Sequence, residues 1–221
     1  MDSLSNSVAE RESVRNFWES HILQWEHRKY SRCSGVDFNA SVKFRRLFAL
    51  ECLAPYLKGR RILELGCGSG SLARTLLDLG AKEYIGVDFA EAAIRQATQG
   101  QRCDPILRER ARFHCDDAGT FAEASDIVFS LGLLDWVDPH TLRKLAERHR
   151  DSLVLHSFSA AGPGLQFWLH KAFSQLTYRR KGGVLPQYRQ PAEVLEVFHD
   201  PKYQIRRHGK LSFGAFLSNF L

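Results

Sequence analysis

The sequence predicts an α/β fold built on a doubly wound, mostly parallel seven-stranded sheet. From residue 61 onward, short apolar runs of strand length alternate with segments of helical periodicity, a pattern typical of a parallel sheet with helices on both faces. The first run leads directly into three glycines at alternate positions, Gly66, Gly68 and Gly70. A strand, a glycine turn and a helix in this order bring backbone N–H groups and a helix N-terminus up to a ligand.

The elements expected from this alternation fill one structural domain. Residues 1–57 should form an N-terminal helical cap, with a frayed tail at 1–12, an aromatic-rich amphipathic helix at 14–30 and a second helix at 42–57. Residues 58–221 should form the sheet domain. Its strands are expected at 61–66, 83–88, 111–115, 125–131, 152–157, 203–208 and 211–220, its helices at 71–79, 90–98, 139–149, 164–177 and 191–198, and a variable stretch at 99–110.

Length and composition are those of a globular protein. The 221 residues suffice for one α/β domain, and the apolar and charged fractions of 44% and 25% are ordinary. No apolar run approaches the length of a membrane span, and the polar start lacks a secretion signal, so we expect a cytoplasmic protein. The five cysteines, an odd number without a C-x-x-C pair, argue against a disulfide framework and a zinc site. The net charge of +6 indicates either an anionic partner or a solvated basic surface.

A second strand-like run ends at Asp88, placed to accept hydrogen bonds from a ribose diol. Together with the glycine loop it indicates a nucleoside cofactor. A dinucleotide fingerprint would need glycine at position 71, which is Ser71, and this disfavours an NAD-dependent dehydrogenase. Phe89, the next residue, has a ring suited to stacking on adenine or to packing in the core.

With Glu64 two residues before the first glycine, the pattern reads Glu-x-Gly-x-Gly-x-Gly and resembles the class I (Rossmann-like) S-adenosylmethionine-dependent methyltransferases. The resemblance covers roughly residues 53–157 and, more loosely, the C-terminal third. It implies a terminal antiparallel hairpin, N-terminal helices over the cofactor, and S-adenosylmethionine as cofactor with S-adenosylhomocysteine as product. It also implies a cofactor site made of Glu64, Gly66, Cys67, Gly68, Gly70, Asp88, Phe89, Asp117, Ala118 and Leu131.

Within that site the resemblance implies a role for each part. Glu64 would hold the methionine amino group, and the backbone near Leu131 would meet the methionine moiety. Asp117 and Ala118 would read the adenine, although Asp116 fits this role with a shift of one residue. Cys67 fits better as a small filler in the loop than as a nucleophile.

Two residues are candidates for the chemistry. His156 ends the strand at 152–157, where substrate should sit, and a partly neutral imidazole can accept a proton or position the acceptor. Asp135 is the alternative base, and it could instead cap the helix near residue 139 or orient His156. The basic segment 178–183 would capture an anionic acceptor or form a solvated loop.

The resulting hypothesis is methyl transfer to an oxygen or nitrogen of a small-molecule acceptor, with an anionic one left open by the basic segment. The strand end near Leu131 lacks the Asn/Asp-Pro-Pro-aromatic and Pro-Cys motifs of nucleic-acid methyltransferases, and it lacks the clustered acids that hold magnesium, so no metal is expected. The alternatives are an RNA- or protein-modifying methyltransferase and a cofactor-binding pseudo-enzyme. The acceptor and the oligomeric state are not predicted.

Overall fold

The computed structural model describes residues 2–30, 40–179, 184–207 and 214–221, and it contains a seven-stranded sheet in the order β3-β2-β1-β4-β5-β7-β6. Strands β1 to β5 pair in parallel, whereas β7 runs antiparallel to both β5 and β6. The doubly wound, mostly parallel sheet with a C-terminal antiparallel hairpin is therefore confirmed. The strands are β1 Arg61–Leu65, β2 Glu83–Asp88, β3 Ala111–Cys115, β4 Ile127–Leu131, β5 Leu153–Ser159, β6 Gln204–Arg207 and β7 Gly214–Ser218.

The helices surround this sheet and lie close to their expected positions, with two exceptions. They are α1 Asp2–Tyr30, α2 Ala40–Leu53, α3 Ala73–Asp78, α4 Glu91–Cys103, α5 Pro105–Arg110, α6 Pro139–Arg148, α7 Leu165–Arg179 and α8 Pro191–Phe198, with short 3₁₀ turns at Ala54–Tyr56 and Leu133–Asp135.

The two exceptions are segments that the sequence analysis left without regular structure. The prediction of a frayed tail at 1–12 is wrong, because α1 begins at Asp2. The helix extends this far since no glycine or proline interrupts residues 2–30. The variable stretch at 99–110 is also wrong, because α4 continues to Cys103 and α5 follows. Asp104 starts α5 by accepting the N–H groups of Ile106 and Leu107 at 2.9 and 3.3 Å, an N-cap followed by a proline in the first turn.

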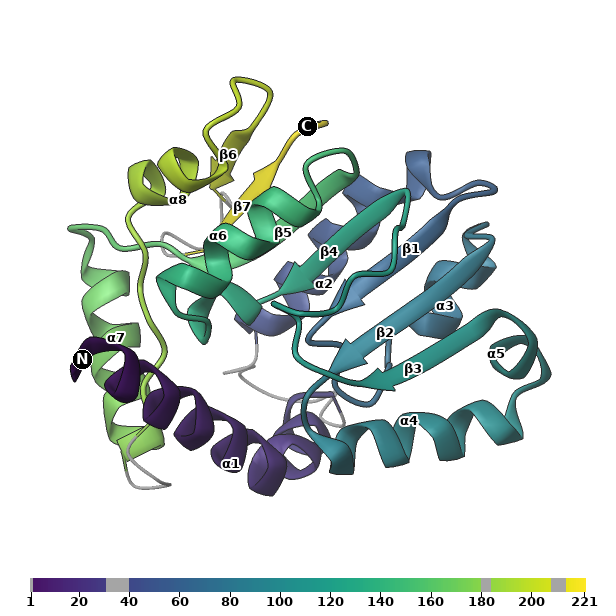
Figure 1. Cartoon of the computed structure of the whole chain (residues 1–221), viewed down its shortest axis with the longest axis horizontal. Helices are drawn as coiled ribbons and strands as arrows, with labels where there is room; N and C mark the ends of the chain where they lie inside the picture. Colours follow the sequence, from purple (N-terminus) through teal and green to yellow (C-terminus); the bar gives the residue numbers. More distant parts are fainter. Residues whose placement is uncertain (1, 31–39, 180–183, 208–213) are drawn as a thin grey trace.

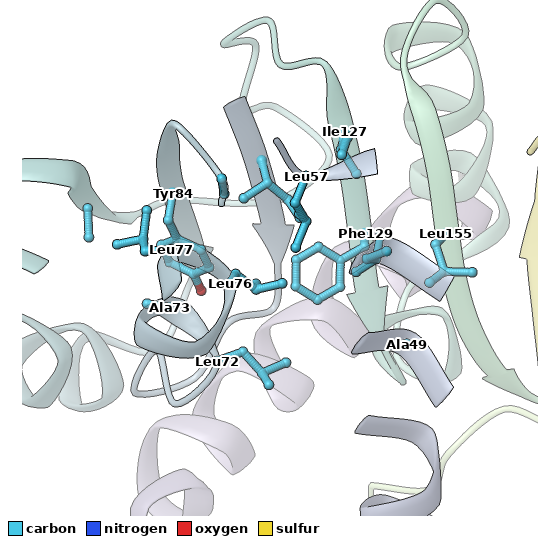
Figure 2. Packing of buried hydrophobic residues seen from close by; sticks show 14 of the residues in the cluster. Ala49, Leu57, Leu72, Ala73, Leu76, Leu77, Tyr84, Ile127, Phe129 and Leu155 are labelled. Carbon is cyan, nitrogen blue, oxygen red and sulfur yellow. The ribbon is translucent and has the colours of Figure 1, made fainter. Parts of the chain in front are cut away.

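The sheet buries apolar side chains on both of its faces. On one face Leu53 of α2 and Leu76 of α3 pack with Phe129 of β4. Figure 2 shows Leu76 beside the Phe129 ring in this cluster. On the other face Val128 of β4 packs with Leu145 of α6. Burial on both sides explains why the central strands read as continuous apolar runs in the sequence.

Helix α1 lies across the carboxyl ends of the parallel strands, between α7 on one side and α4 on the other (Figure 1). The Glu19 carboxylate ties it to α4 by accepting the N–H of Ala92 at 3.0 Å. Ligands of open parallel sheets bind at the carboxyl ends of the strands. The N-terminal helix therefore covers the edge where a ligand is expected.

His156 lies in the core, and the expectation that its ring faces the cleft is wrong. The side chain is 0% exposed, with Nδ1 2.9 Å from Ser130 Oγ and the ring 6.0 Å from that of Phe198. Side chains alternate along a strand, so His156 shares its face of β5 with Val154 and Phe158, which pack in the core, whereas Ser159 lies on the other face. Burial lowers the pKa of His156 to about 3, which keeps the imidazole neutral.

We predict that His156 makes the fold sensitive to acid. Its pKa of about 3 lies below the ordinary value of 6.5. The contribution of the neutral imidazole to the free energy of unfolding is therefore complete above pH 6.5 and is lost as the pH falls toward 3. His149, with a pKa lowered to about 4 by burial, adds to the loss in the same window. His156→Asn keeps a polar partner for Ser130 without titrating. Urea unfolding at pH 7 and pH 4.5 should show a smaller acid-induced loss of free energy in the variant, and equal losses would contradict the prediction.

Candidate functional site

A cavity opens at the carboxyl ends of β1, β2 and β4, and α1, α2 and α7 enclose it. Most of the predicted site residues line this cavity. The predicted cofactor residues Gly70 and Asp117 and the predicted catalytic residue His156 do not. The predicted residues along its wall are Glu64, Gly66, Cys67, Gly68, Asp88, Phe89, Ala118, Leu131 and Asp135.

The glycine loop is held against the end of β2. The N–H groups of Gly66 and Cys67 both donate to the carbonyl of Val87, at 2.8 and 3.1 Å. Gly66, Gly68 and Gly70 have φ values of 74°, 55° and 70°, which glycine adopts without a steric penalty.

The third glycine and the cysteine of the loop serve packing. A Cβ on Gly70 would lie 2.3 Å from the Phe113 ring, so this position needs glycine for the close approach of a side chain from β3. Cys67 is buried, and burial raises the pKa of its thiol, so the side chain is neutral and fills space as expected of a small filler.

Asp88 joins the loop to the next helix. Its carboxylate accepts the N–H of Gly68 at 2.8 Å and the N–H of Ala90 at 2.9 Å. Burial raises the pKa of Asp88, and these backbone donors oppose the shift. The side chain thus sits at the tip of β2 and lines the cavity, where a sugar hydroxyl would be a third donor.

Glu64 is a buried acid at the end of β1. The hydroxyl of Tyr84 donates to its Oε2 at 2.6 Å. Burial raises the pKa of Glu64 to about 8, against the opposing effects of Tyr84 and Arg46. A neutral carboxyl at this place is poised to ionise when a cationic group binds.

The acids after β3 point to different places. Asp116 and Ala118 line the main cavity together with Phe89. Asp117 lines a neighbouring cavity, and its Oδ1 accepts the N–H of Gly119 at 2.7 Å. Both acids therefore share a cavity with Phe89, and Asp116 is the one that lines the same cavity as Glu64 and Asp88.

Asp135 also lines the cavity. Its side chain is 6% exposed and belongs to a cluster of polar groups. It accepts the N–H and the hydroxyl of Ser159 at 2.6 and 2.8 Å, and it pairs with Arg45 at 3.5 Å. Burial raises its pKa and Arg45 opposes this. Asp135 does not cap the following helix, because Asp138 is the N-cap and accepts the N–H of Thr141 at 2.8 Å. Nor does it orient His156, whose Nδ1 lies against Ser130.

Several aromatic residues that line the cavity were not among the predicted site residues. Trp18 forms edge contacts with Trp25 and Trp136, with ring centroids 5.7 and 5.0 Å apart, and Tyr178 of α7 lies 5.4 Å from Trp136. All four rings line the cavity. The aromatic content of 14–30 was a visible signal, although it did not identify a partner.

Charged residues from the helices also reach the cavity. They are Glu26 of α1 and Arg45 and Arg46 of α2. The basic segment 178–183 lies mainly outside the described residues. Among those that are described, no group of three or more His, Cys, Asp or Glu side chains is arranged to hold a metal ion.

Comparisons with known proteins identify the central part of the chain. A family profile described as a methyltransferase domain matches residues 62–154. The chain is 32% identical over 126 residues to a malonyl-[acyl-carrier protein] O-methyltransferase of Bacillus cereus, covering 54% of this chain and 44% of that protein. It is 30% identical over 94 residues to a ribosomal protein L11 methyltransferase of Alkaliphilus oremlandii, covering 42% and 30%. The chain thus spans less than half the length of these curated relatives.

Solved structures match over almost the whole chain. Magnesium protoporphyrin IX methyltransferase (ChlM) of Synechocystis PCC 6803, crystallised with SAH, superposes with a TM-score of 0.69 at 17% identity, over 95% of this chain and 98% of that one. The DhpI–SAH complex gives 0.65 at 17% identity, over 94% and 95%. At 17% identity the likeness to these solved structures shows a shared fold, whereas the family profile shows a domain type. The chain thus has the fold of these methyltransferase structures, and its central part, residues 62–154, matches a methyltransferase domain.

Proposed function

We propose that the chain is an S-adenosylmethionine-dependent methyltransferase that methylates an oxygen or nitrogen of a small-molecule acceptor. The observation that carries the proposal is the convergence of the glycine loop, Glu64 and Asp88 on one enclosed cavity at the strand ends. Structural neighbours crystallised with SAM or SAH support this choice of cofactor.

In this proposal the chain binds the cofactor along the ends of β1, β2 and β4. Asp88 accepts the ribose hydroxyls, and Glu64 receives the methionine ammonium. Phe89, Ala118 and an acid of the pair Asp116/Asp117 hold the adenine. When bound, S-adenosylmethionine supplies an activated methyl group on sulfur. The protein contributes mainly proximity and orientation, which can account for a large share of a transfer rate.

The other half of the cavity fits a small acceptor with an apolar or aromatic body. Trp18, Trp25, Trp136 and Tyr178 are among the residues that line the cavity, and such rings exclude water and stack on flat ligands. Arg45 adds a positive charge beside Asp135. We propose Asp135 as the catalytic group of this half, where it accepts a proton from the acceptor or positions it, and we assign no catalytic role to His156.

A macromolecular acceptor is the second candidate, because curated relatives include ribosomal protein methyltransferases. Within the described parts of the chain, none of the helices combines the length and apolar character needed to cross a bilayer. A cytoplasmic location, as expected from the sequence, stays part of the proposal.

The two candidates separate in one labelling experiment. Incubation of the enzyme with methyl-labelled S-adenosylmethionine and a cell extract should place label in the fraction below about 2 kDa. Label in protein or RNA would favour a macromolecular acceptor. Binding of cofactor without transfer to any fraction would favour a pseudo-enzyme.

We predict that Asp88→Ala weakens cofactor binding. Removing the carboxylate leaves the ribose hydroxyls and the Gly68 N–H without their acceptor, at a cost of about 1–3 kcal/mol. Calorimetry with S-adenosylhomocysteine should show this loss, while NAD should not bind the wild-type protein. An unchanged dissociation constant in the variant would refute the assignment of Asp88.

The raised pKa of Glu64 predicts that affinity depends on pH. Below its pKa of about 8 the carboxyl must release a proton before it can pair with the ammonium, so affinity should rise with pH from 6 to 8 by at most about tenfold per unit and level off above 8. Glu64→Gln cannot ionise and should remove this slope and weaken binding. A pH-independent affinity of the wild-type protein for S-adenosylhomocysteine would argue against the pairing.

Asp135→Asn should lower turnover by roughly 10²–10⁴-fold if the carboxylate is the proton acceptor. Its neighbour Asp138 is the matched control, because Asp138→Asn weakens a helix cap without touching the main cavity. With an acceptor in hand, kcat and KM of both variants decide the role. A rise of KM with unchanged kcat in Asp135→Asn would show positioning of the acceptor, and normal values of both would remove Asp135 from the site.

A further inference from the structure

Glu26 is a buried acid that none of the cofactor motifs includes. It projects from α1 toward the glycine loop, is 6% exposed, and lines the main cavity. Its Oε1 accepts the N–H of Ser69 at 3.0 Å. Its Oε2 is also buried and has no hydrogen-bond partner among the described residues. A buried carboxylate oxygen without a donor is costly, so this atom is suited to a ligand that brings one.

The glycine loop is shaped to let Glu26 come close. A Cβ on Gly68 would lie 2.2 Å from Glu26 Oε1, so any larger residue at position 68 would displace this carboxylate. The N–H of Gly68 itself donates to Asp88 at 2.8 Å. Consecutive amides of the loop are thus held by two different carboxylates, and this arrangement sets Glu26 next to Asp88.

The electrostatic surroundings favour a ligand rich in hydrogen-bond donors. Burial raises the pKa of Glu26, and the charge of Asp88 raises it further, while Ser69 and Arg46 oppose the shift. Glu64 lines the same cavity, so Glu26, Asp88 and Glu64 share one space with two further acids, Asp116 and Asp135. A ribose diol offers two hydroxyl donors, enough for two neighbouring carboxylates.

We propose that Glu26 is a ribose-binding residue, which together with Asp88 receives the two hydroxyl groups of the nucleoside cofactor. This inference rests on the proposed function. It makes α1, which covers the strand ends in Figure 1, a component of the cofactor site as well as its cover.

The test compares two ligands and two variants of the full chain. Glu26→Gln keeps the length of the side chain and an acceptor for Ser69 but loses the charge. Glu19→Gln is the matched control, because Glu19 ties the same helix to the N–H of Ala92 and does not line the cavity. S-adenosylhomocysteine carries both ribose and amino acid, whereas 5′-methylthioadenosine carries the ribose alone.

We expect Glu26→Gln to weaken both ligands by roughly 5- to 100-fold, and Glu19→Gln to change neither by more than about twofold. Weaker binding of S-adenosylhomocysteine alone would overturn the ribose assignment and place Glu26 at the amino acid. Equal effects of the two variants would show that Glu26 acts only by holding α1. Unchanged affinity in Glu26→Gln, in a protein whose binding still depends on Asp88, would overturn this inference and leave the proposed function intact.

Discussion

Three carboxylates packed around one glycine loop are the constraint on which the site depends. Asp88, Glu64 and Glu26 come from β2, β1 and α1 and face the same cavity. Burial raises the pKa of all three, so ionisation costs each of them more here than it would in water. Such an arrangement costs stability in the free protein, and binding of a cationic, hydroxyl-rich ligand would offset that cost. The proposed cofactor has both kinds of group.

The fold was largely predictable because it follows from local signals that agree with one another. The alternation of apolar runs and helical segments predicted where the strands lie along the chain and that they are parallel, and the resemblance to a known family predicted the terminal hairpin. The error at 99–110 came from overlooking the Asp104-Pro105 pair, which starts a helix. The error at 1–12 came from treating polar composition as disorder, although a polar helix can be sustained where residues such as Arg11 find a partner, here Asp138.

From the sequence, a residue could be placed on the wall of the cavity only where its position at a strand end fixes its direction. Asp88 and Glu64 satisfy that condition. His156 fails because side-chain direction alternates along β5: its ring lies on the core face, whereas Ser159, three residues later, lines the cavity. The need for glycine at position 70 comes from the Phe113 ring, which packs against it. This contact could not be predicted, because the two residues are far apart in the sequence. Helical periodicity showed that 14–30 has an apolar side, but it could not show which part of the sheet that side would meet.

Helix α1 links the two halves of the cavity physically. At Glu26 it meets the glycine loop, and two turns earlier Trp18 packs against Trp136, which belongs to the half proposed for the acceptor. Glu19, between these contacts in the chain, fixes the helix to α4. Because one continuous helix provides all three contacts, a shift of α1 would alter the cofactor half and the acceptor half together. If a ligand in one half favours one position of α1, it changes the affinity of the other half for its own ligand by some factor. By thermodynamic linkage, the second ligand then changes the affinity for the first by the same factor.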